Sequence, residues 1–472
     1  MAVTATVTAT KIDITSTGGA EVTFGEVVTA VNAVTAGTIT GSGTSGDPYT
    51  ITAATYRELE ISANCNVTFE ANTYVQWQWS NTSGTYVVLD MASGSTVTME
   101  EGVHLDFGYT GTYRRGYIYL YGALYVNGTS GNGVEWSNYR SFYDYSRDHV
   151  EVEYLTLKDP TYSSGYMYHF ENYATLDNKE ARSYNNVTVT DTSGNQGGRI
   201  YMVDMGNPVT NTTWADWTVT DLEYIYLNIT TCKLTRWNIE SLKQYISVSG
   251  SGHAVGSRYE TSKDDTGFSD KYFQPSLMFD NCTIGLSTNQ SYILYVRYGS
   301  QLYLKNCTFL TDNILNYYGS RILEYGDENR IGGSRIWNSD ATYLRCREIG
   351  VKVQDSSGNP IEGATVILVQ QPDRKEEHCG FTNSDGKLLD MFGNNAKVVQ
   401  REETSANNFE DWSNDLAGGT AYHSLVVSKY GYGTYSTNFE ATEDREYVIT
   451  LYEAGSTPTT LIGCTLYSTV LY

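Results

Sequence analysis

Three tyrosines alternate with aliphatic residues in the segment Tyr117-Ile118-Tyr119-Leu120-Tyr121. Successive side chains of a strand point to opposite faces, so Ile118 and Leu120 are predicted to enter the core while the tyrosines share the outer face. Such a row can contact sugars or be buried against another subunit. We therefore take Tyr117, Tyr119 and Tyr121 as candidate ligand-binding residues and keep both roles open.

Paired carboxylates are a second possible source of chemistry. Glu151 and Glu153 fall on one face of the predicted strand Val150–Tyr154, roughly 7 Å apart. Carboxyl pairs separated by about 5 to 9.5 Å cleave glycosidic bonds. Two solvated glutamates that oppose edge aggregation are the simpler interpretation. We therefore predict no catalytic residue and keep polysaccharide cleavage as an alternative.

Metal-ligand patterns are weak in this sequence. None of the six histidines has a partner four residues away or a cysteine at zinc-site spacing. His378 and Cys379 are adjacent, which directs their side chains apart on a strand. Asp264, Asp265 and Asp270 lack the ligand order of an EF-hand loop. Nucleophile-elbow and phosphate-loop motifs are also missing, so we expect neither a metal nor a cofactor.

The seven cysteines include no C-x-x-C pair. Cys282 and Cys307 occupy equivalent positions in two copies of a repeat, so their Cα atoms could lie within disulfide range. In-register parallel strands rarely supply the required dihedral angle. We therefore predict two stacked, buried thiols.

Charge excludes one large class of partner. Lys and Arg number 31 against 54 Asp and Glu, a net charge of −23, which leaves no basic surface for phosphate neutralisation. The segment Met1–Val7 lacks the basic and apolar blocks of a secretory signal. Apolar runs are too short to span a bilayer. We expect no nucleic-acid partner and no membrane insertion.

Internal repeats indicate the architecture that positions these residues. Val67–Trp77 aligns without gaps on Val97–Phe107, an offset of 97 − 67 = 30, and Asn281–Ile284 recurs as Asn306–Phe309, an offset of 306 − 281 = 25. Strand-bearing repeats of about 20 to 30 residues are typical of β-solenoids, in which each turn buries its apolar face against the next.

The repeat also predicts which side chains face inward. Alternation places Val97 and Met99 in the core and Thr98 outside. Asn281 and Asn306 begin their copies of the repeat, where a corner in the left-handed backbone conformation suits asparagine. These features predict an all-β chain built on a right-handed parallel β-helix.

The C-terminal region carries a family resemblance. Val351–Val366 followed by Thr382–Lys387 resembles the carboxypeptidase regulatory-like, prealbumin or CnaB-type sandwich, an Ig-like β-sandwich. The segments read as a strand, a Ser-Gly-Asn-Pro turn, a second strand and an Asn-Ser-Asp-Gly hairpin, with Arg445–Leu451 as the closing strand. A polar insertion at Arg401–Thr420 is atypical of the family. The resemblance implies a spacer, docking or adhesive module.

The expected layout has four parts: an N-terminal attachment segment and linker (1–45), a parallel β-helix (46–347), the sandwich (348–453) and a C-terminal strand or tail (454–472). Gly41–Ile51 looks like the opening motif of β-helix modules in microbial surface and virion proteins.

This layout resembles bacteriophage spikes and fibres. It implies a virion structural protein, such as a tail spike, fibre or capsid appendage, that recognises a host surface or glycan. The expected partners are other virion proteins, host surface polysaccharide and further copies of the chain in a homotrimer. The alternatives are a microbial cell-surface adhesin, exposed outside the cell, and a polysaccharide-degrading tailspike enzyme.

Overall fold

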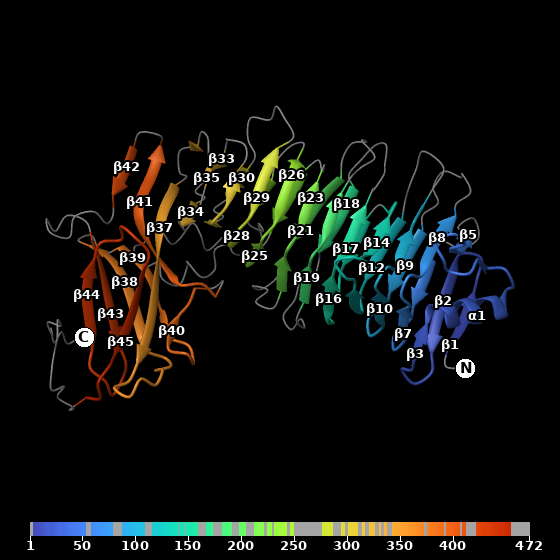
Figure 1. The fold of residues 1–472 in the computed structure, drawn as a ribbon, viewed down its shortest axis with the longest axis horizontal. Helices are drawn as coiled ribbons and strands as arrows, with labels where there is room; N and C mark the ends of the chain where they lie inside the picture. Colours follow the sequence, from blue (N-terminus) through green and yellow to red (C-terminus); the bar gives the residue numbers. More distant parts are fainter. Residues whose placement is uncertain are drawn as a thin grey trace.

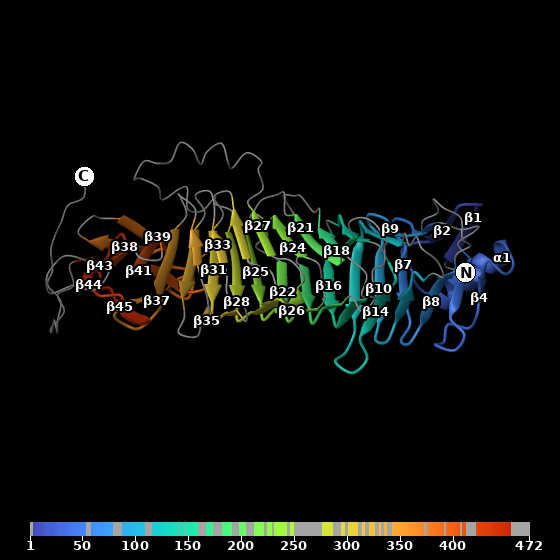
Figure 2. The same cartoon turned by 90° about the horizontal axis from the view of Figure 1, so that it is seen from above.

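The computed structural model describes residues 3–52, 58–78, 87–108, 116–139, 141–146, 148–158, 167–172, 182–190, 198–203, 212–220, 224–228, 231–242, 246–249, 276–286, 294–297, 301–309, 314–316, 321–325, 330–331, 335–337, 342–371, 375–390, 393–405, 408–411 and 422–454. These residues form an elongated, mainly β molecule with the N-terminal strands at one end and a C-terminal sandwich at the other (Figures 1 and 2).

Three long sheets make up most of the molecule, which we call the body. Sheet A contains β1 (Val3–Val7), β2 (Lys11–Ser16), β6 (Glu58–Ile61), β9 (Val87–Met91), β12 (Gly116–Leu120), β15 (Ser141–Asp144), β18 (Met167–Asn172), β21 (Gly198–Val203), β24 (Tyr224–Asn228), β27 (Ile246–Ser249), β30 (Leu294–Arg297), β33 (Ile314–Asn316) and β36 (Arg335–Trp337). Sheet B begins with β3 (Glu21–Thr23), β7 (Asn66–Phe69), β10 (Thr96–Glu100), β13 (Ala123–Asn127), β16 (Val150–Glu153), β19 (Arg182–Asn185), β22 (Thr212–Ala215), β25 (Thr231–Thr235), β28 (Ser276–Asp280), β31 (Gln301–Lys305), β34 (Arg321–Tyr325) and β37 (Thr342–Gln354). Sheet C contains β4 (Ile39–Thr40), β5 (Tyr49–Thr52), β8 (Tyr74–Gln78), β11 (His104–Asp106), β14 (Val134–Ser137), β17 (Leu155–Lys158), β20 (Thr188–Thr190), β23 (Thr218–Thr220), β26 (Asn238–Leu242), β29 (Thr283–Leu286), β32 (Thr308–Phe309) and β35 (Arg330–Ile331).

The chain visits the three sheets in turn, and each strand from β5 to β34 pairs in parallel with the strand three places later. The predicted 30-residue repeat is confirmed, because Val67 of β7 lies in register with Val97 of β10. Val97 and Met99 are fully buried while Thr98 faces outward, as alternation predicted. The all-β class and the long parallel sheets are therefore confirmed.

Single residues in the left-handed conformation form the corner between sheets B and C. Asn186, Asn281 and Asn306 have φ between +51° and +54°, which confirms the corner role predicted for asparagine. The corner N–H of Asn281 donates to the carbonyl of Lys305 on the next turn (2.8 Å). The corners thus continue the hydrogen-bonding ladder between turns.

The N-terminal segment is built into the sheets of the body. Strands β1 and β2 form an antiparallel pair, and β2 then pairs in parallel with β6. Helix α1 (Phe24–Val34) begins with a capping box between Thr23 and Glu26. Phe24 is fully buried and stacks on Phe69 at 4.5 Å. This helix therefore covers the apolar core at the first end of the body, where a further turn would otherwise pack.

The C-terminal sandwich has two layers around a separate apolar core. One layer contains β39 (Lys375–Phe381), β38 (Thr365–Gln371), β43 (Tyr422–Ser428) and β44 (Tyr435–Phe439). The other contains β37, β40 (Lys387–Leu388), β41 (Ala396–Ser405), β42 (Asn408–Asp411) and β45 (Arg445–Thr450). The predicted Ser357–Pro360 turn is present, with Gly358 at the positive φ that it requires. Asn383–Gly386 also forms a turn with Gly386 at positive φ, but the predicted hairpin is wrong, because the flanking strands β39 and β40 pair with β38 and β37 in different layers.

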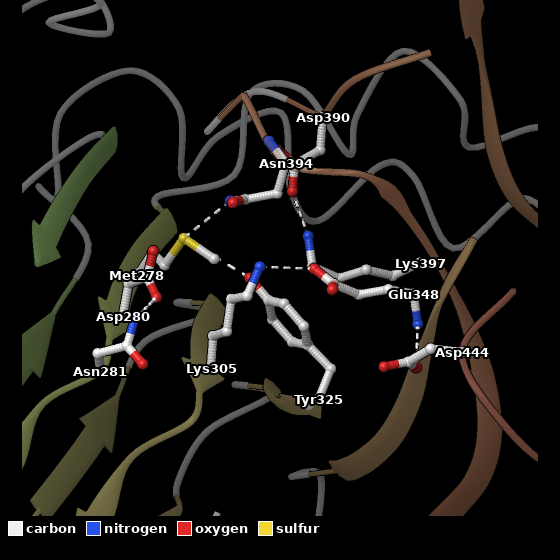
Figure 3. A network of polar contacts seen from close by, with 10 residues as sticks. All are labelled: Met278, Asp280, Asn281, Lys305, Tyr325, Glu348, Asp390, Asn394, Lys397 and Asp444. Atoms are coloured by element: carbon white, nitrogen blue, oxygen red, sulfur yellow. Dashed lines mark hydrogen bonds and ion pairs between the residues drawn. The ribbon is translucent and has the colours of Figure 1, made fainter. Parts of the chain in front are cut away.

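One strand joins the body to the sandwich. The first part of β37 pairs with β34 in the body, and its second part pairs with β45 in the sandwich. Around this strand, Lys305 donates to Glu348 (2.9 Å), and Lys397 forms an ion pair with Asp390 (Figure 3). Met278, Tyr325, Leu344, Cys346 and Val399 form a small apolar core beneath these ion pairs. Among the residues described, no helix is long and apolar enough to cross a bilayer.

Candidate functional site

Five tyrosines gather on the outer surface of sheet A; we call them the tyrosine cluster. On β12, Ile118 and Leu120 are fully buried, while Tyr117, Tyr119 and Tyr121 face outward, as predicted. Tyr121 is 38 % exposed. The cluster is completed by two further residues on and just after the neighbouring strand β15, Tyr143 and Tyr145.

The rings of this cluster are nearly parallel across the two strands. Tyr119 lies in register with Tyr143, and their ring centroids are 5.2 Å apart with planes 11° apart. The rings of Tyr121 and Tyr145 are separated by 5.1 Å and 10°. Nearly parallel rings at this separation are stacked and not coplanar, because coplanar rings side by side need more room. The ring faces between β12 and β15 are therefore turned toward each other.

The surface that the cluster offers to solvent follows from this geometry. Side chains of a strand stand roughly perpendicular to the sheet, so the phenol oxygens and ring edges form the outermost layer. Phenol groups both donate and accept hydrogen bonds. The cluster therefore presents hydrogen-bonding hydroxyls over an apolar base, a surface suited to a ligand rich in hydroxyl groups.

A row of carboxylates continues the outer face beyond the tyrosines. Glu60 of β6 lies in register with Asp90 of β9, and Asp90 lies in register with Tyr119. Glu58 lies two residues before Glu60 on β6, and Lys11 of β2 pairs with both Glu58 and Glu60. We call Glu58, Glu60 and Asp90 the carboxylate row. Acidic and aromatic groups thus form one continuous surface over successive strands of sheet A.

Burial and neighbouring charges perturb the titration of this surface. Burial, and secondarily the charge of Glu58, raise the pKa of Asp90 to about 6, although Lys11 opposes the shift. Burial and the charge of Asp90 likewise raise the pKa of Tyr121. Asp90 can therefore act as a hydrogen-bond donor below about pH 6 and as an acceptor above it, beside Tyr121, whose raised pKa keeps its phenol neutral.

The carboxylate row is also the place where the described residues could hold a metal ion. One oxygen from each of Glu58, Glu60 and Asp90 lies within 4.8 Å of the others. Oxygen ligands of this type suit hard cations such as Ca²⁺ or Mg²⁺. Lys11 supplies a positive charge to the same carboxylates, so part of their charge is already compensated within the chain.

Sequence reasoning found part of this surface and missed the rest. It brought Tyr117, Tyr119 and Tyr121 together but did not select Tyr143, Tyr145 or the carboxylate row. Two signals were present. Tyr143 and Tyr145 repeat the Tyr-x-Tyr spacing of β12, and the offset from Glu60 to Asp90 is 90 − 60 = 30, the same as that of the repeat.

The structure places the remaining candidates away from this surface. Glu151 and Glu153 lie on β16 of sheet B. Glu153 accepts hydrogen bonds from Asn185 (2.7 Å) and Asn186 (3.1 Å) on the next turn, which gives it a structural role.

The remaining candidates from the sequence are the cysteines, His378 and three aspartates. Cys282 and Cys307 are buried thiols that form no disulfide, as predicted, and burial raises the pKa of Cys282. His378 and Cys379 lie on β39 of the sandwich. The expected polar loop with Asp264, Asp265 and Asp270 lies outside the described residues.

Comparison with protein-family models found no match, and comparison with curated proteins found none either. The functional assignment therefore rests on the geometry of the chain itself.

Proposed function

We propose that this chain is an elongated structural and recognition protein of a virion, a tail spike, fibre or capsid appendage, that binds host surface polysaccharide through the tyrosine cluster. In this proposal the body is a right-handed parallel β-helix. Crossover connections between parallel strands are right-handed in nearly all known cases. A chain that visits three parallel sheets in turn therefore fits a right-handed helical coil. The extended body would hold the recognition surface away from its base.

The observation that carries the recognition role is the tyrosine cluster beside the carboxylate row. Tyr119 and Asp90 are in register on adjacent strands, so phenol hydroxyls and carboxylate oxygens lie side by side within the reach of one oligosaccharide. Carboxylates accept hydrogen bonds from sugar hydroxyls, and the tyrosine rings supply apolar contact. Tyr121 is the most accessible member of the cluster, and it would make the first contact.

A glycan array tests this role with wild-type protein and a triple variant, Tyr117→Ser, Tyr119→Ser and Tyr121→Ser. We expect the variant to keep its β-rich circular dichroism and its assembly while losing binding to the glycans that the wild type recognises. Tyr125→Ser is the matched control, because Tyr125 is a partly exposed tyrosine of sheet B.

The outcomes of this test separate the two roles kept open for the cluster. Loss of assembly in the triple variant would assign the cluster to a subunit interface instead. Unchanged binding alongside unchanged assembly would contradict both roles and leave the tyrosines as strand residues favoured for β propensity.

The proposal includes assembly as a homotrimer, because virion spikes of the type that this chain resembles usually assemble in threes. A measured mass three times that of the chain is expected from light scattering at micromolar concentration. A monomeric mass would count against the proposal. Labelling of purified virions with antibody to this chain would separate a virion component from a cell-surface adhesin.

Polysaccharide cleavage is the second candidate, and one observation favours it. Asp90 has a pKa of about 6, while Glu58 and Glu60 lie within 4.8 Å. A protonated acid beside an ionised carboxylate is the arrangement that glycosidases use, with separations of about 5 Å in retaining enzymes. Release of reducing ends from a bound polysaccharide, abolished by Asp90→Asn, would establish it. Binding without release would leave recognition alone.

A further inference from the structure

The parallel ring pairs of the tyrosine cluster bring together groups that can react with each other. We propose that the cluster is a site of oxidative cross-linking, at which a one-electron oxidant joins Tyr119 to Tyr143, or Tyr121 to Tyr145, through a carbon–carbon bond. The oxidant class is a haem peroxidase acting with hydrogen peroxide. This proposal does not depend on sugar binding, since it concerns the tyrosine rings alone.

The geometry favours coupling within these two pairs. Tyr119 and Tyr143 are direct neighbours on parallel strands, and their rings are 5.2 Å apart and nearly parallel. The rings of Tyr121 and Tyr145 are equally close, at 5.1 Å. The new carbon–carbon bond lies in the planes of both rings, so two stacked rings must rotate before they can join. Coupling then needs a change of side-chain torsions and no separation of the strands.

Contacts within the cluster extend the pairs into one connected group. Tyr119 also lies 6.1 Å from Tyr117 and 6.4 Å from Tyr121, and Tyr143 lies 6.0 Å from Tyr145. Tyr121, at 38 % exposure, is open to an oxidant in solution. Once Tyr121 is oxidised, its radical lies beside an unoxidised tyrosine ring. Oxidation of that second ring then gives two neighbouring radicals that can couple.

The reaction balances with two oxidising equivalents. Each phenol loses one electron and its hydroxyl proton and becomes a phenoxyl radical. The two radicals form a bond between carbons adjacent to their oxygens, and the hydrogen on each of these carbons moves to oxygen to restore the phenols. The protein loses two hydrogen atoms in all, and one hydrogen peroxide is reduced to two waters.

The sequence provides a direct readout. Trypsin cleaves after Arg115, Arg140 and Arg147, so the β12 tyrosines leave in peptide 116–140 and the β15 tyrosines in peptide 141–147. After treatment of the full chain with horseradish peroxidase and hydrogen peroxide, a cross-link yields both peptides joined, at their summed mass minus two hydrogens. An uncut 116–147 peptide has a different mass, their sum minus one water.

We expect this joined species to be the main tyrosine cross-link and its yield to be independent of protein concentration. The double variant Tyr143→Phe and Tyr145→Phe, which keeps both rings, should fail to form it. Tyr125→Phe is the matched control, because Tyr125 leaves in the same tryptic peptide but stacks on His149 at 5.3 Å. This control should cross-link as wild type does.

Three results would overturn the proposal. They are cross-links distributed evenly over the other tyrosine peptides, a yield that rises with protein concentration, and a joined 116–140 and 141–147 species that persists in the double variant. Circular dichroism of each variant before oxidation confirms that the sheets are intact, so loss of the cross-link reports the missing hydroxyls.

Discussion

Two groups of outward-facing tyrosines on the body have opposite surroundings. The tyrosine cluster lies on sheet A with its phenols toward solvent. On sheet B, Tyr303 and Tyr325 also point away from the main core, but Lys397 of the sandwich lies over both rings. Figure 3 shows Tyr325 in these surroundings. Tyr325 is 1 % exposed, and Lys397 lies 4.4 Å from its ring centroid. Alternation placed both groups outside the main core, and only the sandwich made one of them interior.

The two environments provide different partners for the ring and the hydroxyl of tyrosine. In the open cluster, rings stack on each other and solvent can reach the hydroxyls. In the covered group, the Tyr325 hydroxyl donates to the sulfur of Met278 (3.6 Å), and Lys397 sits between the rings and its ion-pair partner Asp390. Burial raises the pKa of Tyr325 far above its usual range, so its phenol stays neutral. The covered group serves stability, whereas the open cluster remains available for binding.

The largest expected effect comes from the main core, which both groups avoid. Met99→Asp places an unpaired charge among buried side chains, and we expect a loss of more than about 4 kcal/mol in the free energy of unfolding. Thr98→Asp, one residue away and outward, should change it by about 0.5 kcal/mol or less. Urea unfolding monitored by circular dichroism measures both. Equal tolerance would contradict the assignment of inward and outward faces.

An identical substitution in both tyrosine groups sharpens the comparison. Tyr325→Ser removes a buried ring and leaves a cavity under the sandwich, so we expect a loss of about 3–5 kcal/mol. Tyr119→Ser removes stacking at a partly exposed site and should cost about 1 kcal/mol. Thermal and urea unfolding of the two variants provide the measurement. Similar losses would mean that the open cluster is as essential to folding as the covered group.

A smaller effect is expected from Asp90 and depends on pH. Its pKa is raised to about 6 in the folded chain, so the folded state holds the proton more tightly than the unfolded chain does. The stability that Asp90 contributes is therefore complete below about pH 4 and is lost as the pH rises through about 6. Asp90→Asn should raise the melting temperature at pH 7 relative to wild type and have little effect at pH 4.

The size of this pH effect is modest. Asp90 is partly exposed, so after allowance for solvent screening we expect on the order of 1 kcal/mol at pH 7. Glu151→Gln is the control, because Glu151 is an exposed acid on sheet B, and its melting temperature should follow wild type at both pH values. A difference between Asp90→Asn and wild type that is constant across pH would contradict a raised pKa.

Short-range pattern was enough to predict much of the fold. The 30-residue repeat gave the register of Val67 with Val97, and asparagine corners and glycine turns were predicted from backbone preferences alone. The 25-residue offset from Asn281 to Asn306 likewise matches the register of Thr283 with Thr308. The register of the turns between these two repeats was not accessible, because the segments between strands vary in length. Tyr143 lies opposite Tyr119 at an offset of 143 − 119 = 24, which the 30-residue repeat does not predict.

Buried polar groups were the second limit of sequence reasoning. Asp144 occupies an inward position on β15, where alternation leads one to expect an apolar residue. It is fully buried, paired with Arg182 at 2.5 Å, and it accepts a hydrogen bond from Tyr184 at 2.7 Å. These partners lie 38 and 40 residues further along the chain. Nothing in the local sequence could show that the charge is compensated.

The most direct test of the open cluster as a recognition surface is hydroxyl-radical footprinting of the wild-type chain, with and without a polysaccharide that it binds on the array. Tryptic peptide 322–330 contains Tyr325 as its only aromatic residue, and peptide 141–147 contains Tyr143 and Tyr145. We predict rapid tyrosine oxidation in 141–147 and slow oxidation in 322–330. When polysaccharide is bound, we predict protection of 141–147 and of the other cluster peptide, 116–140, and none of 322–330. Equal oxidation of 141–147 and 322–330 in the free chain, or protection elsewhere with none at either cluster peptide, would contradict the account.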